Sequence, residues 1–277
     1  DKIEKENIHM HLYTNPAQGY LSDDIIDKVS KLFDEAEAKV SDQPELLERV
    51  RVARMPIVYA RMFPRNGYEI KDGKLVFQGE MASQNEVMDF IARMKKHGFR
   101  NIREMFGDNP DDLLMLHYFL TSNLQVATID NDYLAVDVVP ALAGRALRII
   151  DKASGECVTA YNVKKALLFP FCGGLEDRIG EASSFEGLMG LAKITEQTPD
   201  SLTLNMQIGD LKLERKFELV SEKPALMIIS TLTNAGKASK KVRLRSHLEL
   251  DLGELRSTRV KIARPAGENI NKDMADI

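Results

Sequence analysis

The chain has 277 residues, 44% of them hydrophobic, with a formal net charge of -4 and a pI near 5.8. This length and apolar content predict one large folded domain or two ordinary ones. The mildly acidic balance gives no global reason to expect a nucleic acid or an anionic membrane as partner. No run of about 18 or more apolar residues is present, so we predict no membrane insertion. The first residues, "DKIEKENIHM", lack the apolar segment of a signal peptide, which suggests a processed or excised piece.

The cysteines and histidines form no recognisable cofactor or metal motif. Cys157 and Cys172 are too few for a disulfide framework and have no zinc-ligand spacing with the five histidines. They form a single bridge or remain two buried thiols. His9 and His11 would lie on one side of a strand and could bind a metal, but no third ligand is identifiable nearby. We therefore expect neither a metal nor a cofactor.

Residues 1–122 have the apolar spacing of α-helices. Ser22 can cap a first helix whose apolar residues form a stripe at helical spacing. A second helix is predicted to open where Asp42 and Glu45 have capping-box spacing, and Pro56 is predicted to kink or split it. The few residues between the two helices predict an antiparallel helical hairpin.

A small β-hairpin is predicted near residues 68–77 within this helical domain. Asp72-Gly73 lies between two short β-forming runs and is the signal of a two-residue turn. Beyond the hairpin, Ser83 and Glu86 have the spacing of another capping box, so a further helix is expected to start there.

From about residue 123 the apolar period changes from helical to alternating. Apolar and polar residues alternate in "TLNMQI" and "LKLERKFEL", which is typical of half-buried antiparallel strands. Further strands separated by turn signals predict that residues 123–265 form an antiparallel β-sandwich. Residues 266–277 have little apolar content and are predicted to be a tail or a truncated continuation. The predicted fold class is α+β, with the helical region first.

The strand predicted for residues 241–252 carries most of the candidate chemistry. Its apolar side chains are expected to pack on one face. Its polar face carries Arg243, Arg245, His247, Glu249 and Asp251. Such a row is either a solvated sheet face or a set of hydrogen-bonding groups presented to a polyhydroxylated ligand. His247 is the only histidine of the β half, so it is the candidate general acid or base.

A second polar cluster lies in "FPFCGGLEDRIGEA", residues 169–182. Its glycine pair lacks the strand, the glycine spacing and the helix start of a nucleotide-binding loop. Gly173 and Gly174 are instead expected to bend the chain between strands. The charged residues that follow are either solvated or line a sugar cleft. They are Glu176, Asp177, Arg178 and Glu181.

Longer stretches of the chain resemble known families. "DNDYLAVDVVPALAGRALRIIDKASGECVTA" and "GDLKLERKFELVSEKPALMIISTLTNAGKASKKVRLRSHLELDLG" resemble the galactose mutarotase-like sandwich of aldose epimerases and of many glycoside-hydrolase carboxy-terminal domains. "HLYTNPAQGYLSDDIIDKVSKLFDEAEAKV" and "LLERVRVARMPIVYARM" are similar to the helical region that follows the catalytic barrel in large bacterial glycoside-hydrolase-like proteins containing a domain of unknown function. The resemblance implies a galactose mutarotase-like supersandwich, complete or truncated.

The resemblance implies a non-barrel, carboxy-terminal portion of a carbohydrate-active protein that supports or extends carbohydrate binding. The implied partners are a mono- or oligosaccharide and an upstream catalytic barrel of the same polypeptide. The implied location is periplasmic or extracellular. The residues expected to bind carbohydrate are Glu176, Asp177, Arg178, Arg245 and His247.

Two alternatives stay open. In one, the sandwich is itself a sugar epimerase, mutarotase or lyase, with His247 as acid or base and Glu249 or Asp251 as its partner. The resemblance places His247 near the catalytic histidine of epimerases, but epimerases need a second histidine, which the β half lacks. In the other alternative, the chain is a purely structural or protein-interaction module. On the family resemblance, this piece is not a complete enzyme.

Overall fold

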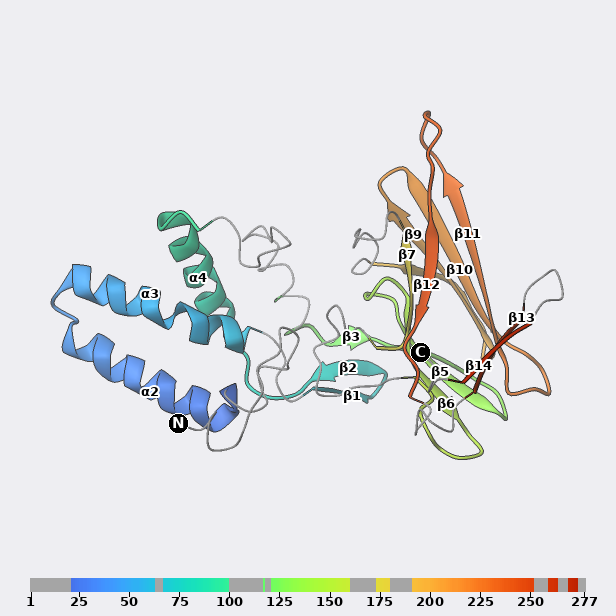
Figure 1. Ribbon diagram of the computed structural model, residues 1–277, viewed down its shortest axis with the longest axis horizontal. Coiled ribbons are helices and arrows are strands. Elements are labelled where there is room, and N and C mark those ends of the chain that lie inside the picture. Colours follow the sequence, from blue (N-terminus) through green and yellow to red (C-terminus); the bar gives the residue numbers. More distant parts are fainter. Residues whose placement is uncertain are drawn as a thin grey trace. The chain divides into compact units, whose positions relative to one another are not determined.

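The computed structural model describes residues 21–62, 67–99, 117, 121–159, 173–179, 191–251, 259–263 and 269–273. Within them, three α-helices are followed mainly by antiparallel strands, so the fold is α+β with the helices first, as predicted (Figure 1). The described residues divide into two compact units, 21–124 and 125–273. We call them the helical unit and the β unit and describe each by itself.

The helical unit is built on three helices. Helices α2 (Asp23–Lys39) and α3 (Pro44–Arg61) run antiparallel to each other, as the short connection predicted (Figure 1). Helix α4 (Gln84–Lys96) packs on α3. The buried core of this unit comes mainly from α3, α4 and the residues beside them: Met55, Met62, Ala82, Val87, Phe90, Ile91 and Met94.

The helix starts agree only in part with the sequence predictions. Ser22 is the N-cap of α2, although its side chain bonds no backbone N–H of the helix. Helix α3 begins at Pro44 with Gln43 as N-cap, because the fixed φ of proline suits the first turn, and the predicted cap at Asp42 is therefore wrong. Pro56 does not split α3, which continues to Arg61. One missing backbone hydrogen bond is tolerated within this long helix.

The local signals around the predicted hairpin are confirmed. Strands β1 (Tyr68–Lys71) and β2 (Lys74–Phe77) pair antiparallel around Asp72 and Gly73, whose φ angles are 51° and 66°. Two successive positive φ angles are the geometry that an Asp-Gly turn supplies. The short strand β3 (Leu124–Gln125) completes this three-stranded sheet.

The capping box predicted at Ser83 is also confirmed. Its hydroxyl accepts a hydrogen bond from the Glu86 backbone N–H, and the Glu86 carboxylate accepts one from the Ser83 N–H at 2.8 Å. These reciprocal bonds fix the first residue of α4.

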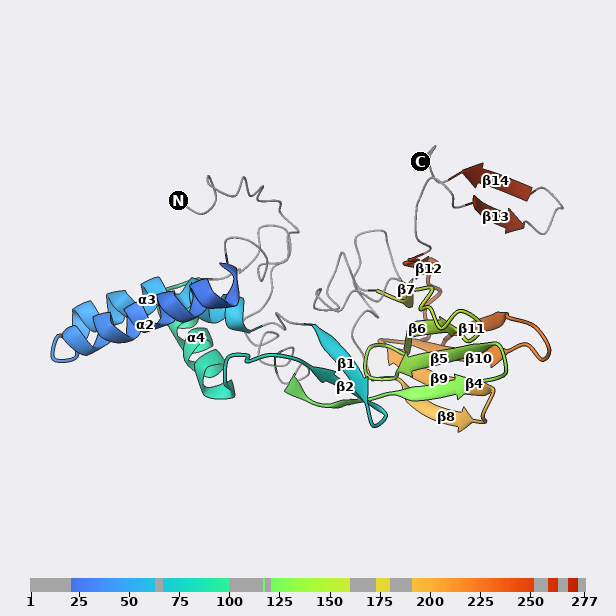
Figure 2. The same cartoon turned by 90° about the horizontal axis from the view of Figure 1, so that it is seen from below.

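The β unit contains two antiparallel sheets that share one hydrophobic core (Figure 2). The five-stranded sheet has the order β12-β7-β6-β5-β4, and the four-stranded sheet has the order β11-β10-β9-β8. The strands of the first sheet are β4 (Ala127–Asp130), β5 (Leu134–Val139), β6 (Arg145–Asp151), β7 (Leu175–Ile179) and β12 (Leu244–Leu248). Those of the second are β8 (Lys193–Gln197), β9 (Ser201–Ile208), β10 (Leu211–Leu219) and β11 (Leu226–Asn234).

The core of the β unit follows from the alternation in its strands. On β9 and β10 the buried apolar residues are Leu202, Leu204, Met206, Leu211, Leu213, Phe217 and Leu219. Facing residues on the other sheet include Val136, Val138, Ala146, Leu175 and Ile179. Each sheet therefore presents one apolar face to the other, as the period of two predicted.

The strand predicted for residues 241–252 is shorter and less covered than expected. β12 spans Leu244–Leu248 and pairs with β7, so among the described strands it lies at the edge of the sheet. Leu244 and Leu248, expected on the packed face, are 38% and 43% exposed. An edge strand has neighbours on one side only, which explains the incomplete burial.

The predicted tail contains regular structure. β13 (Arg259–Ala263) and β14 (Asn269–Asp273) form an antiparallel hairpin in which Ile262 pairs with Ile270. Backbone pairing needs no long apolar run, so the low apolar content of residues 266–277 did not predict β14.

Several residues of the predicted metal, disulfide and sugar sites lie outside the part of the chain that the structure describes. Cys157 is a free, half-buried thiol, while Cys172, His9, His11 and Glu181 lie outside the described residues. Among the residues that are described, no group of three or more His, Cys, Asp or Glu side chains could hold a metal ion. Of the described helices, none is both long enough and apolar enough to span a membrane.

Candidate functional site

The two stretches that carry the candidate residues form neighbouring strands. β7 and β12 pair antiparallel, with Arg245 opposite Arg178 and His247 opposite Glu176 in the register. The segment after the glycine pair therefore lies beside the strand that bears His247. We call this strand pair, β7 and β12, the candidate site.

Glu249 is held beside His247 by the glycine bend. The Oε1 atom of Glu249 lies 3.9 Å from Nδ1 of His247. The other carboxylate oxygen, Oε2, accepts a hydrogen bond from the Gly173 N–H at 3.0 Å, and the Glu249 N–H donates to the Gly174 carbonyl at 2.9 Å. Both the backbone and the side chain of Glu249 are therefore anchored, which fixes the carboxylate next to the imidazole.

The glycine pair is a bend that only glycine fits. Gly173 and Gly174 have φ angles of 68° and 72°, a conformation that side chains disfavour. A Cβ atom on Gly174 would lie 2.3 Å from the carbonyl oxygen of Ala146 and 2.8 Å from Cα of Leu147. The pair thus lets β7 approach the backbone of β6 and brings the Gly173 N–H to Glu249.

Arg245 offers an unused guanidinium at the candidate site. Its side chain is exposed and makes no hydrogen bond or ion pair in the described part of the chain. Because residues two apart on a strand point to the same face, Arg245, His247 and Glu249 form one row. This row can donate hydrogen bonds through Arg245 and both donate and accept them through His247.

Asp177 does not lie at the rim of the candidate site, so its expected contact with carbohydrate is wrong. The residue is 3% exposed and points between the two sheets. Its carboxylate lies 2.7 Å from Nη2 of Arg215 and accepts hydrogen bonds from Ser230 Oγ at 2.8 Å and Ser246 Oγ at 2.5 Å. These interior contacts occupy both carboxylate oxygens, which leaves none for a ligand at the surface.

A sequence signal for this interior cluster exists. Each member takes an inward position in an otherwise apolar alternation: Asp177 between Leu175 and Ile179, Arg215 between Leu213 and Phe217, Ser230 between Ile228 and Leu232, and Ser246 between Leu244 and Leu248. An acidic and a basic residue that both break such a pattern are candidates for a buried ion pair. Arg215 also donates to the Gly144 carbonyl at 3.1 Å, which links the sheets a second time.

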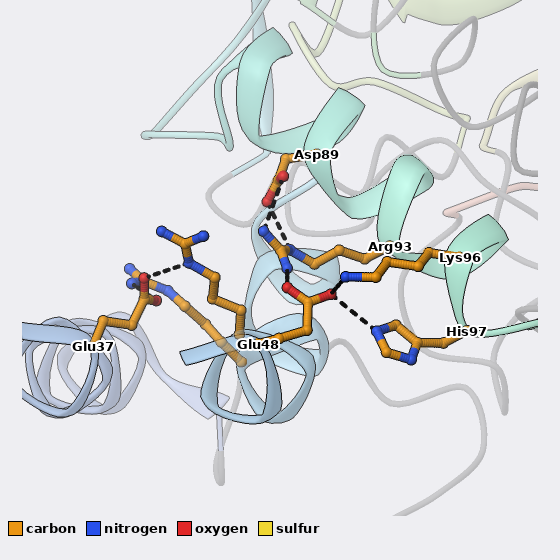
Figure 3. Close-up of polar contacts among 8 residues, drawn as sticks. Glu37, Glu48, Asp89, Arg93, Lys96 and His97 are labelled. Atoms are coloured by element: carbon orange, nitrogen blue, oxygen red, sulfur yellow. Dashed lines mark hydrogen bonds and ion pairs between the residues drawn. The ribbon is translucent and has the colours of Figure 1, made fainter. Parts of the chain in front are cut away.

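The helical unit contains a separate ionic cluster centred on Glu48 (Figure 3). The Glu48 carboxylate accepts hydrogen bonds from His97 at 3.0 Å, from Lys96 at 2.9 Å and from Arg93. Arg93 is also held by Asp89, with Nε 2.9 Å from Oδ2. The bonds from His97 and Lys96, with a smaller effect of Arg93, lower the pKa of Glu48 to about 2 against the opposing effect of burial.

A second set of ion pairs joins α2 to α3 near the same cluster. Arg51 and Arg54 of α3 reach Glu37 of α2 at 3.1 Å and 3.0 Å, and Arg54 also reaches Asp34 at 2.7 Å. The carboxylates of both sets already have cationic partners. We therefore assign the ionic cluster to helix packing rather than to ligand binding. The sequence did not reveal it because its members come from three helices.

No family model, curated protein or solved structure matches the chain. The resemblance to glycoside-hydrolase-like proteins and to the galactose mutarotase-like sandwich therefore stays a prediction. The function has to be argued from the geometry of the candidate site.

Proposed function

We propose that the β unit binds carbohydrate at the candidate site, with Arg245 and His247 as the contacting side chains. The observation that carries the proposal is the exposed guanidinium of Arg245, which has no partner among the described side chains, in one row with an imidazole whose carboxylate neighbour is anchored. Glu176 and Arg178 are the adjacent positions on β7 by register. Asp177 is not included, because its carboxylate is bound inside the β unit.

The chemistry of this row suits a polyhydroxylated ligand. A sugar hydroxyl both donates and accepts hydrogen bonds, so it can accept from a guanidinium and donate to an imidazole nitrogen or a carboxylate. The Glu249 carboxylate is already oriented by Gly173, so the ligand does not bear the entropic cost of ordering it.

The proposal also covers the fold family, the neighbouring domain and the location of the protein. We infer a galactose mutarotase-like supersandwich that supports a catalytic barrel of the same polypeptide, in a periplasmic or extracellular glycoside-hydrolase-like protein. The support for this setting is the resemblance of the sequence stretches quoted above.

Calorimetric titration with a panel of mono- and oligosaccharides tests the proposal. We expect saturable binding of at least one sugar, weakened about tenfold or more in Arg245→Ala and in His247→Ala. Lys193→Ala removes an exposed cation from β8 of the other sheet and serves as the matched control, with unchanged affinity. Absence of binding across the panel would reduce the β unit to a structural or protein-interaction role.

Acid–base chemistry on a sugar is the second candidate, favoured by the contact of 3.9 Å between His247 and Glu249. A carboxylate that is fixed beside an imidazole can orient the ring and stabilise its protonated form. Exchange at the anomeric carbon of an aldose, followed by NMR, should then exceed the uncatalysed background. It should vanish in His247→Ala and fall in Glu249→Gln. Exchange at the background rate in the native chain excludes this activity for the aldose used.

A further inference from the structure

The helical unit contains a hollow beside the start of α4 that has no role in the fold described above. It has a volume of about 350 Å³ and lies among β2, the N-terminus of α4 and the residues His117, Thr121 and Asn123. Sites for small molecules usually measure roughly 300–1,000 Å³, so this hollow is large enough for a ligand of monosaccharide size.

The lining of the hollow is uncharged. Phe77 and Met81 supply apolar surface, and the side-chain amides of Gln84 and Asn123 supply polar groups. Among the described lining residues, none is acidic or basic apart from His117. An ion entering this hollow would lose hydration without meeting an oppositely charged side chain among the described lining residues, whereas a neutral ligand would lose less.

Two side chains of the lining have unused hydrogen-bonding capacity. The amides of Gln84 and Asn123 are exposed and form no hydrogen bond within the described part of the chain. Each amide has an acceptor oxygen and a donor nitrogen, so each can bond a hydroxyl in either sense. The hydroxyl of Ser83, by contrast, is already bonded to Glu86.

His117 is a buried residue of the lining. It is 4% exposed, and its Nε2 lies 2.7 Å from the Ala82 carbonyl oxygen, to which it donates in the neutral ring. Burial lowers the pKa of His117, although the Ala82 carbonyl and the charge of Glu86 act in the opposite direction. Its Nδ1 is shielded from solvent and has no hydrogen-bond partner among the residues that the structure describes. A buried acceptor without a donor is costly, so a ligand hydroxyl that reached Nδ1 would recover that cost.

We propose that this hollow is a binding site for a neutral, hydroxyl-rich ligand of monosaccharide size, held by the amides of Gln84 and Asn123 against Phe77. It shares no residue with the candidate site of the β unit and does not depend on the function proposed there. Free sugars and small polyols have the same hydroxyl chemistry, so the experiment must contain both.

The test uses the full chain and follows the side-chain amide signals of Gln84 and Asn123 by NMR. These signals are assigned from their loss in Gln84→Ala and Asn123→Ala. Glucose, galactose, N-acetylglucosamine, glycerol and inorganic phosphate are titrated separately. We expect saturable shifts of both amides with at least one neutral sugar and none with phosphate, and an affinity about tenfold weaker in either variant.

Two controls separate this site from the candidate site of the β unit. Asn85→Ala removes a neighbouring exposed amide that does not line the hollow and should leave the affinity unchanged. Arg245→Ala should leave the amide shifts unchanged while it weakens binding to the β unit. Saturation by phosphate, saturation by glycerol alone, or amide signals that no sugar shifts would each overturn the proposal.

Discussion

Asp177 and Arg215 form an ion pair through the interior of the β unit, with the side chains 0% and 3% exposed and Oδ2 2.7 Å from Nη2. Asp177 belongs to the five-stranded sheet and Arg215 to the four-stranded sheet. Because Ser246 of β12 bonds the same carboxylate, the pair also fixes the edge strand that bears His247. The interior cluster thus positions the candidate site without contacting a ligand.

Removal of the Asp177 carboxylate should destabilise the β unit strongly. Asp177→Ala leaves the guanidinium of Arg215 buried without its counter-ion, which costs about 3–5 kcal/mol in the free energy of unfolding. Urea unfolding of the β unit, followed by hydrogen exchange of the β9 and β10 amides, measures this loss.

Two variants test the cause of that loss. Asp177→Leu combined with Arg215→Met replaces the pair by apolar side chains and should cost much less than Asp177→Ala. Lys240→Ala removes the partner of Asp210 in an exposed pair, 40% and 58% exposed, and should cost less than about 1 kcal/mol. Equal losses in Asp177→Ala and Lys240→Ala would contradict the assigned role.

Gly174 should be intolerant of any side chain. Gly174→Ala imposes a left-handed φ on alanine and places Cβ 2.3 Å from the Ala146 carbonyl oxygen, so we expect a loss of roughly 2–4 kcal/mol. Gly209 also has a positive φ, of 56°, but a Cβ atom there would meet nothing within 4 Å. Gly209→Ala should therefore lower the free energy of unfolding by only about 1–2 kcal/mol. The difference between the two variants in the free energy of urea unfolding measures the cost of the steric clash with β6. Equal losses would mean that β6 moves aside at little cost.

Local patterns predicted much of the fold because they act over a few residues. The turn at Asp72-Gly73 and the capping box at Ser83 each depend on a conformation that neighbouring residues determine. The alternation in β9 and β10 likewise reports a sheet with one buried face. The capping-box spacing at Asp42 misplaced the N-cap of α3 by one residue, because the helix begins at Pro44 with Gln43 as N-cap.

The candidate site could be predicted only in part, because register is a long-range property. The sequence identified Arg245, His247 and the residues after the glycine pair as polar positions, and their strands are neighbours. The alternation with Leu175 and Ile179 is a signal for the inward side of Asp177, which the prediction did not use. The partner of Asp177 could not be predicted, because Arg215 lies on another sheet and is remote in sequence.

The helical unit should lose stability in acid as Glu48 becomes protonated. Hydrogen bonds from His97, Lys96 and Arg93 lower the pKa of Glu48 from 4.5 to about 2 in the folded chain. The folded state therefore binds this proton less readily than the unfolded state, and the stabilisation is complete above about pH 4.5 and declines toward pH 2. Thermal melts of the helical circular-dichroism signal should show this decline.

Glu48→Gln should reduce the decline in melting temperature between about pH 4.5 and pH 2, since glutamine does not titrate. Asn85→Ala introduces no change in titrating groups and should keep the native slope. A Glu48→Gln variant with the full native slope between these pH values would assign the acid sensitivity to other carboxylates.

His117 should add a second loss of stability at a higher pH. Burial lowers the pKa of His117 from its ordinary 6.5 against the raising effects of the Ala82 carbonyl and Glu86, so the unfolded chain takes up this proton first. Its stabilisation is complete above about pH 6.5 and declines as the pH falls toward the folded pKa. His117→Gln can keep a donor near the Ala82 carbonyl but cannot titrate, so it should remove this part of the profile. Melts between pH 7.5 and 5.5 lie above the range in which Glu48 titrates, and an unchanged slope in His117→Gln would show that His117 does not cause the loss.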